Sequence, residues 1–251
     1  RNAQAAIEKA DYGKAVALLK PLADKGNAEA LYVLGRLTLD GKGVKKSEQR
    51  AAQLFRQAAE KGDISAQNAW GTAQASGQGV RRNYREAARW FRKAAEQGLA
   101  MAQYNLGYLY AYGRGVPKDE NAAIDWYSRA ANQGLADAQY SLGWTYLNSK
   151  GENQSDTKAV HWFEKAAEQD NLKAQNNLAY MYAEGRGYAQ DPVKAVQWYN
   201  RAAERGYAEA QYNLGFMYEQ GRGVPQDYNK AVEWYRKAAE QNEPAAQYSL
   251  G

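Results

Sequence analysis

The sequence predicts an all-α solenoid built from helix-turn-helix repeats of 36 residues. Three recurring features support this fold. A pair of alanines returns at a fixed interval, from Ala58–Ala59 to Ala238–Ala239. A glycine-rich loop precedes the alanine pair in each copy. The glycine of an L-G pair keeps the same interval, at Gly35, Gly71, Gly107, Gly143, Gly215 and Gly251, with Ala179 at the remaining step. Such a period is typical of repeats that stack in one direction.

The repeat register sets the expected domain organisation. No insertion interrupts it from residue 28 to the end of the chain. We therefore expect one solenoid domain over residues 1–251, with an N-terminal helical half-repeat at 1–27 and the start of a truncated further repeat at 244–251. The full repeats are about 28–63, 64–99, 100–135, 136–171, 172–207 and 208–243. Because the chain starts at Arg1 and stops within a motif, we expect a processed or trimmed fragment.

The first helix of a repeat is predicted over stretches such as AEAQYNLGFMYEQ. Here Ala210, Leu214, Met217 and Tyr218 recur at helical spacing and form one apolar stripe. Gly221 then ends the helix, at a position where glycine adopts positive φ without steric cost.

The second helix is predicted to begin after a short polar residue that accepts a free backbone N–H of the first turn. This position holds Asp11, Ser47, Asn83, Asp119, Ser155, Asp191 and Asp227. Pro192 lies at the first helical position, where its missing N–H costs nothing. The small residues of the motif let helices approach closely, so we expect each repeat to bury its apolar face by stacking on the next.

Several repeats depart from the common pattern. In the first full repeat, Leu54 takes the place of the tryptophan that recurs in the second helix. Thr38 and Gln74 take the place of a tyrosine that the later first helices keep, at Tyr110, Tyr146, Tyr182 and Tyr218. In the fourth repeat, Ser149 replaces the first loop glycine within NSKGENQSD. Mobility of this loop, a new direction for contact, or sequence drift would each explain the change.

The pattern A-x-A-Q-x-x-L-G-x-x-Y-x-x-G-x-G-V, followed by D-x-x-x-A-x-x-W-[FY]-x-x-A-A-x-x-G, resembles the Sel1-like repeat family, whose units are related to the tetratricopeptide repeat. The resemblance covers essentially the whole chain. It implies a right-handed α/α superhelical solenoid that acts as a protein-interaction scaffold or adaptor. Many members are bacterial and exported, with links to envelope signalling or host interaction, and the resemblance implies such a role here.

Little in the sequence points to catalysis. The chain has no Cys and a single histidine, His161, so we expect no metal and no cofactor. The loop G-x-G lacks the preceding strand and the third glycine of a dinucleotide fingerprint. We predict that the protein is not an enzyme. The alternative is a weak β-lactam-hydrolysing enzyme, because one subset of the family is described as β-lactam-binding, although that subset is cysteine-rich.

The charge pattern favours a solvated surface. The formal net charge is +5, which leaves a nucleic-acid binder with a basic surface as a second alternative. Acidic and basic residues alternate along the chain, however, and clusters such as Arg81–Arg82–Arg85 are short. No stretch approaches the ~18 apolar residues of a membrane span. We therefore expect no nucleic-acid partner and no membrane span.

The resemblance places the binding site on the first helices, which line the concave groove in the tetratricopeptide fold. Opposite its apolar stripe, each first helix from the third repeat on carries aromatic and amide side chains. The predicted protein-binding residues are Tyr104, Asn105, Tyr108, Tyr112, Tyr140, Trp144, Asn148, Asn177, Tyr180, Tyr212, Asn213 and Phe216. Exposed aromatic side chains are typical of binding hot spots. The alternative is that these aromatic rings pack between adjacent first helices.

These observations predict a monomeric scaffold that binds a protein or peptide segment in its groove. The opening AAIEKADYGKAVALLKPLADKGN resembles the segment that follows a signal peptide in exported bacterial members. That likeness implies a periplasmic or secreted location.

Overall fold

A computed structural model describes residues 2–250, and those residues form helices and loops without any β-strand. The predicted all-α class is thereby confirmed. The helices fall into two compact units that divide after Ala130. Each unit is described by itself, and a single domain over residues 1–251 stays a prediction.

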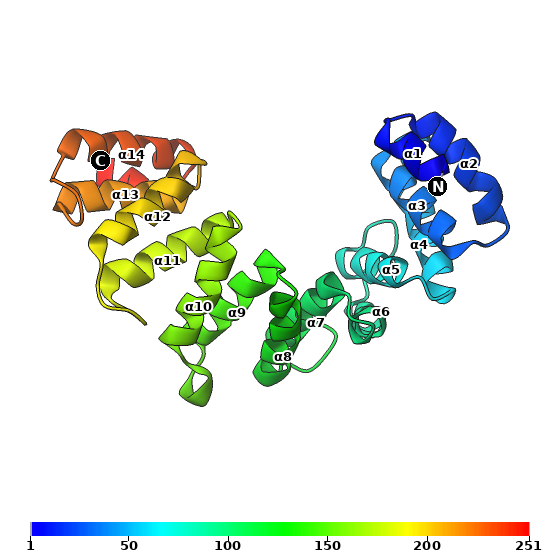
Figure 1. Cartoon of the computed structure of the whole chain (residues 1–251), viewed down its shortest axis with the longest axis horizontal. Helices are drawn as coiled ribbons and strands as arrows, with labels where there is room; N and C mark the ends of the chain where they lie inside the picture. Colours follow the sequence, from blue (N-terminus) through cyan, green and yellow to red (C-terminus); the bar gives the residue numbers. More distant parts are fainter. Residues whose placement is uncertain (1, 251) are drawn as a thin grey trace. The chain divides into compact units, whose positions relative to one another are not determined.

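The first unit is a series of helices joined by short loops. They are α1 (Asn2–Glu8), α2 (Tyr12–Asp24), α3 (Ala28–Asp40), α4 (Glu48–Glu60), α5 (Ile64–Ser76), α6 (Tyr84–Glu96), α7 (Ala100–Tyr112) and α8 (Glu120–Asn132), whose last turn crosses the division. From α1 to α7, each helix packs against the next one along the chain. Figure 1 shows the hairpins α3–α4 and α5–α6, which are the first and second helices of two repeats.

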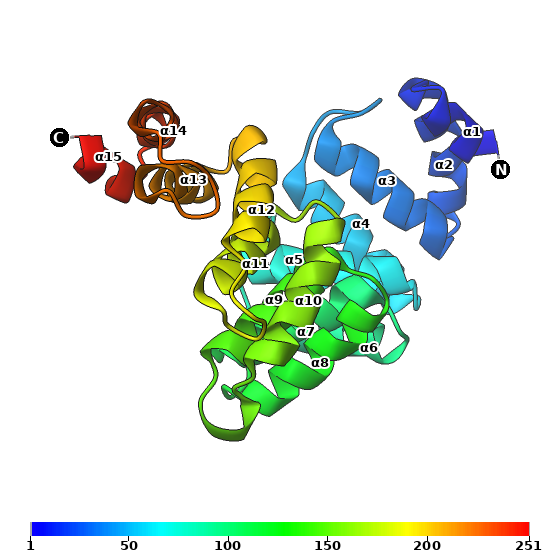
Figure 2. The ribbon, with the colours of Figure 1, turned by 60° about the vertical axis from the view of Figure 1, so that its left-hand side comes forward.

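The second unit continues the same pattern. Its elements are α9 (Ala136–Asn148), the 3₁₀ turn η1 (Gly151–Asn153), α10 (Asp156–Glu168), α11 (Leu172–Glu184), α12 (Pro192–Glu204), α13 (Ala208–Gln220), α14 (Tyr228–Glu240) and α15 (Pro244–Leu250). Each α-helix contacts its successor, and the hairpin of α13 and α14 is visible in Figure 2. Odd-numbered helices from α3 to α13 are first helices, and even-numbered helices are second helices.

The predicted helix boundaries are confirmed at both ends. The capping side chains accept backbone N–H groups of the first turn, as in Ser47 Oγ with Arg50 N at 3.2 Å and Asp119 Oδ1 with Ala122 N at 2.9 Å. The glycines after five first helices adopt the left-handed conformation, as Gly221 does at φ 65°. Ser149 is the exception: its backbone is extended, and η1 follows. The loop of the fourth repeat therefore differs because a residue with a Cβ disfavours the left-handed cap.

The second glycine of each regular loop is required by a close approach between repeats. A Cβ at Gly79 would overlap the backbone of Glu48, the first residue of the preceding second helix. The same overlap would occur between Gly115 and Tyr84 and between Gly223 and Pro192. These loops thus pack against the repeat before them, which requires both a positive φ and the absence of a side chain.

The core of each unit lies between first and second helices. In the second unit, Phe163, Leu178 and Met181 are fully buried. A Cβ on Gly143 would lie 2.8 Å from the Phe163 ring. The L-G glycine therefore makes room for the aromatic ring of the second helix in its own repeat, which explains why small residues recur there.

A glutamine ladder, which sequence reasoning missed, joins successive hairpins. Gln211 Nε2 of α13 donates to Ala203 O at the end of α12, at 3.1 Å. Gln241 Nε2, which follows α14, then donates to Gln211 Oε1 at 2.8 Å. Gln211 is buried, so these bonds supply partners for polar groups that water cannot reach. The motif A-x-A-Q keeps this glutamine in later repeats, and this recurrence could have predicted a structural role for it.

Candidate protein-binding surface

Within each unit, first helices of consecutive repeats lie side by side. Asn105 Nδ2 of α7 donates to Asn68 Oδ1 of α5 at 2.9 Å. The second unit repeats this contact, because Asn213 Nδ2 of α13 donates to Asn176 Oδ1 of α11 at 2.9 Å. We use the term first-helix face for the surface of α7, α9, α11 and α13 that carries the predicted binding residues, in each unit separately.

The first row of predicted residues, Tyr104, Tyr140 and Tyr212, is half-buried, and each ring packs within its own repeat. The ring centroids lie 5.7 Å apart for Tyr104–Tyr127, 5.9 Å for Tyr140–Phe163 and 5.4 Å for Tyr212–Tyr235. In each pair the second ring belongs to the second helix of the same repeat. These tyrosines therefore contribute to packing inside the hairpin as well as to the face.

The second row of predicted residues, called the amide row, consists of Asn105, Asn148, Asn177 and Asn213. Most of these side chains form hydrogen bonds within or between the first helices. Asn105 and Asn213 each use an amide hydrogen in the bonds between first helices. Asn148 Nδ2 donates to Trp144 O within its own helix, at 2.9 Å. Asn177 Nδ2 is enclosed and has no hydrogen-bond partner within residues 2–250. Part of the amide row thus follows the alternative of packing between repeats.

The third row, which consists of Tyr108, Trp144, Tyr180 and Phe216, presents aromatic rings to solvent. Trp144 is 45% exposed and Tyr180 is 43% exposed, while Tyr108 and Phe216 are half-buried. In the first unit Tyr112 is 59% exposed, and its ring lies 4.6 Å from that of Tyr108. In the second unit Tyr140 and Trp144 stack at 6.4 Å. Large exposed apolar side chains that lie together are typical of interaction surfaces.

An arginine lies against the exposed rings of the first unit. The Arg114 guanidinium is 5.3 Å from the centroid of Tyr108, 5.8 Å from that of Tyr112 and 5.6 Å from that of Tyr84. Cation–π attraction to three rings holds this loop side chain at the edge of the first-helix face. Among the described residues, no carboxylate forms an ion pair with Arg114.

A second arginine lies beside Tyr180 in the other unit. Arg186 forms a bidentate pair with Asp156, with N–O distances of 2.9 and 2.7 Å. The hydrogen bond to Asp156 chiefly, and the Tyr180 hydroxyl in addition, raise the pKa of Arg186 above its ordinary value. This pair fixes the loop after α11 on α10.

Together these loop residues follow a rule that sequence reasoning missed. In four of the five regular loops, the residue between the two glycines contacts the first residue of the preceding second helix, thirty positions earlier, whereas Arg222 of the fifth loop pairs with Glu184. The pairs are Lys42 over Tyr12, Gln78 with Glu48, Arg114 over Tyr84 and Arg186 with Asp156. Residues that attract each other, such as a cation and an aromatic ring, recur at this separation in the sequence, and this pattern could have predicted the contacts.

The second helices carry a different aromatic surface. Each recurring tryptophan is half-buried, and a lysine or arginine three residues later covers its ring. The cation-to-centroid distances are 4.1 Å for Lys93–Trp90, 4.6 Å for Arg129–Trp126, 5.4 Å for Lys165–Trp162, 4.8 Å for Arg201–Trp198 and 4.0 Å for Lys237–Trp234. These rings are covered by the chain itself, unlike those of the third row.

The recurring tyrosine of the first helices points toward the second helices. The Tyr182 hydroxyl donates to Glu164 Oε1 at 3.2 Å, and Tyr188 donates to Glu164 Oε2 at 2.9 Å. Burial and then the Glu164 charge raise the pKa of Tyr182 to about 12. Lys194 covers the Tyr182 ring at 5.3 Å. This tyrosine is therefore part of the structure and not of the first-helix face.

Other chemical features are few in the part of the chain described. His161 is exposed and contacts the ring of Trp162. No cluster of three or more His, Asp or Glu side chains is placed to hold a metal ion in residues 2–250. Over the same residues, none of the helices combines the length and apolar character that crossing a bilayer requires.

Comparison with known proteins identifies the repeat. The Sel1 repeat model matches residues 4–27, 28–63, 64–99, 100–135, 136–171, 172–207 and 208–243. No curated protein sequence matches the chain. A Sel1 repeat protein from Oxalobacter formigenes has a similar structure, with a TM-score of 0.83 and 34% identity, over 94% of this chain and 96% of that one.

A longer protein is also similar. The structure of c5321, a protective antigen present in uropathogenic Escherichia coli strains that displays an SLR fold, matches with a TM-score of 0.88 and 36% identity. The match covers 94% of this chain and 50% of the antigen, so the chain spans about half the length of that relative. Sel1 repeats generally serve as scaffolds for protein binding, without enzymatic activity of their own. By its repeats and by both structural relatives, the chain belongs to the Sel1 repeat family.

Proposed function

We propose that the protein is a scaffold that binds an extended, apolar segment of a partner protein on its first-helix face. The third row carries this proposal, because Trp144 and Tyr180 remain exposed although burial of such rings is favourable. The covered tryptophans of the second helices offer no comparable surface. Binding would remove the exposed rings from water and place the partner backbone near the amide row.

In each unit, the first-helix face supplies the proposed groove. Its half-buried first row and its amide bonds hold the third row in place before a partner arrives, so little ordering accompanies binding. Tyrosine and tryptophan have few rotatable bonds and a large contact area, which suits them to this role. We extend the proposal to an exported bacterial protein that acts at the envelope or on a host, since its relatives include the E. coli antigen.

The experiment selects a peptide on the wild-type chain from a displayed library and measures its affinity for variants. Replacement of Tyr108, Trp144 and Tyr180 by alanine should weaken binding by about 100-fold, because aromatic hot spots contribute most of the binding energy. Circular dichroism should show that the variant remains helical. This loss would support binding on the first-helix face.

A matched control removes exposed apolar side chains from the second helices. Val193, Tyr228 and Val232 are 54%, 63% and 36% exposed, and their replacement by alanine should leave the affinity within about twofold. If the control variant lost binding while the first-helix variant kept it, the proposed face would be wrong.

A further inference from the structure

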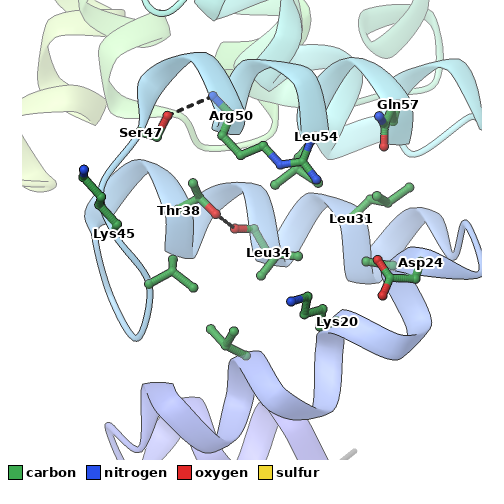
Figure 3. A pocket seen from close by; sticks show the side chains of 13 residues that line it. Lys20, Asp24, Leu31, Leu34, Thr38, Lys45, Ser47, Arg50, Leu54 and Gln57 are labelled. Carbon is green, nitrogen blue, oxygen red and sulfur yellow. Dashed lines mark hydrogen bonds between the residues drawn. The ribbon is translucent and has the colours of Figure 1, made fainter.

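The first unit contains a pocket of about 510 Å³ between α2, α3 and α4. Its floor is apolar and includes Leu31, Leu34 and Leu54. Leu31, Leu34 and Thr38 lie on the side of α3 opposite to Tyr32 and Arg36, which continue the stripe of the first-helix face. Figure 3 shows Leu34 and Lys20 on facing helices, with Arg50 extending from α4 toward Leu54. The pocket is therefore separate from the proposed protein-binding surface.

The pocket occurs where the first full repeat lacks two aromatic side chains. Thr38 occupies the repeat position of Tyr182, and Leu54 occupies that of Trp198. In the second unit both of those rings pack against the buried core. Thr38 and Leu54 are too small to fill the same volume, so the space that a phenol and an indole occupy in later repeats is left open here.

Two cations of the pocket lie at repeat positions from which a cation contacts the phenol in some later repeats, although Glu164 holds the Lys20 position beside Tyr182. Arg50 lies at the repeat position of three lysines that cover tyrosine rings, at 5.1 Å for Lys158–Tyr146, 5.3 Å for Lys194–Tyr182 and 5.2 Å for Lys230–Tyr218. Lys20 lies at the position of Arg92, which donates to the Tyr110 hydroxyl. Both side chains line the pocket, and the lining includes no tyrosine that they could contact.

The rim of the pocket is cationic. Lys20, Lys45 and Arg50 line it together with one carboxylate, Asp24. In the described part of the chain, none of the three cations forms an ion pair. The Arg50 guanidinium donates to the neutral side chain of Gln53, at 3.2 Å. An excess of positive charge around an apolar floor favours a ligand that is apolar at one end and anionic at the other.

We propose that this pocket binds an aromatic carboxylate, with its ring on Leu31, Leu34 and Leu54 and its carboxylate between Lys20, Lys45 and Arg50. The ring would restore the packing that tyrosine and tryptophan provide in later repeats. The carboxylate would accept charge-assisted hydrogen bonds from the rim. A free aryl acid and the C-terminal aromatic residue of a peptide share this chemistry.

The test uses calorimetric titration of the whole chain with indole-3-acetate and with the tripeptide Gly-Gly-Trp, which ends in a free carboxylate. Saturable binding of either probe at a ratio of one to one supports the proposal, and the tighter probe identifies the source of the ligand. The neutral analogue 3-methylindole should bind about tenfold more weakly, because it lacks the group that the cations recognise. If neither acid binds, or if 3-methylindole binds as tightly as they do, the proposal is wrong.

A variant that restores the repeat pattern locates the site. In Thr38→Tyr/Leu54→Trp, the two rings should fill the pocket and abolish binding. The same change should raise the melting temperature by a few degrees, because it fills a cavity with side chains that the backbone already accommodates in other repeats. Unchanged affinity in this variant would overturn the proposal.

A second variant keeps the test decisive if the filled protein does not fold. Lys20→Gln/Arg50→Gln leaves the pocket open and removes two cations, so affinity for the acids should fall about five- to tenfold while affinity for 3-methylindole stays the same. As a control, Lys25→Gln removes an exposed lysine that does not line the pocket and should change neither affinity. Equal effects of the rim variant on the acid and on the neutral ring would contradict the role of the cations.

Discussion

At the residue scale, the second loop glycines allow each loop to pack closely against the preceding repeat. A Cβ at Gly79 would overlap the Glu48 backbone, and its φ of 71° is one that other residues rarely adopt. We predict that Gly79→Ala lowers the free energy of unfolding by about 3 kcal/mol, from backbone strain and overpacking together. Chemical denaturation of the variant and the wild type measures the change.

The matched control is a glycine that also has a positive φ but has no close neighbour. Gly98 has a φ of 92°, and a Cβ there would meet nothing within 4 Å. Gly98→Ala should cost about 1 kcal/mol, from conformation alone. Equal losses in the two variants would show that the approach of the loop to the preceding repeat contributes nothing.

At the element scale, the glutamine ladder joins successive hairpins through hydrogen bonds of a buried side chain. Gln211→Leu keeps the volume but removes two hydrogen bonds, the one to Ala203 O and the one from the Gln241 amide, while Ala203 O still accepts from Gly206 N. We predict a loss of about 1–3 kcal/mol in the free energy of unfolding, because each of the two lost hydrogen bonds contributes about 0.5–1.5 kcal/mol. Gln197→Leu on the exposed side of α12 is the control and should stay within about 0.5 kcal/mol of the wild type. If Gln211→Leu left the free energy of unfolding unchanged, water would have replaced the hydrogen bonds of the ladder.

Local chemistry explains which elements were predictable. A cap such as Ser47 and a terminal glycine such as Gly221 act within one turn of chain, so the sequence shows them directly. The contact of Arg186 with Asp156 spans two elements and depends on how one loop meets another helix. The pocket was equally hidden, although both replacements, Thr38 and Leu54, were visible. The effect of a missing ring emerges only once the neighbouring helices are in place.

The candidate site was predictable only in part. Helical periodicity selected a stripe that includes both Tyr140 and Trp144, yet the first packs on Phe163 and the second faces solvent. Periodicity gives the direction of a side chain from its own helix and not the position of the next helix. The third row, rather than the amide row, therefore carries the proposed function.

At the scale of the whole molecule, buried tyrosines link stability to alkaline pH. Burial raises the pKa of Tyr127, Tyr199 and Tyr235 above the ordinary value of 10.0, and that of Tyr182 to about 12. A raised pKa means that the folded state holds the phenolic proton more tightly than the unfolded state does. The stability from this effect is fully present below pH 10 and is lost as the pH rises through 10 toward 12.

We predict that the melting temperature falls steeply between pH 10 and pH 12, and that Tyr199→Phe makes this fall shallower. Phenylalanine already occupies the equivalent positions at Phe55, Phe91 and Phe163, so the replacement should be tolerated. Thermal melts followed by circular dichroism across this pH range provide the measurement. Identical pH profiles for the variant and the wild type would show that Tyr199 does not ionise on unfolding.

The most direct test of the central claim maps where a bound peptide lies. A peptide selected on the wild-type chain, carrying one photoreactive benzoylphenylalanine, is cross-linked to the protein, and the modified residues are found by mass spectrometry. We predict cross-links to the first helices, at or beside Tyr108, Trp144, Tyr180 and Phe216. Cross-links confined to the second helices, around Trp162, Trp198 and Trp234, would contradict the assignment of partner binding to the first-helix face.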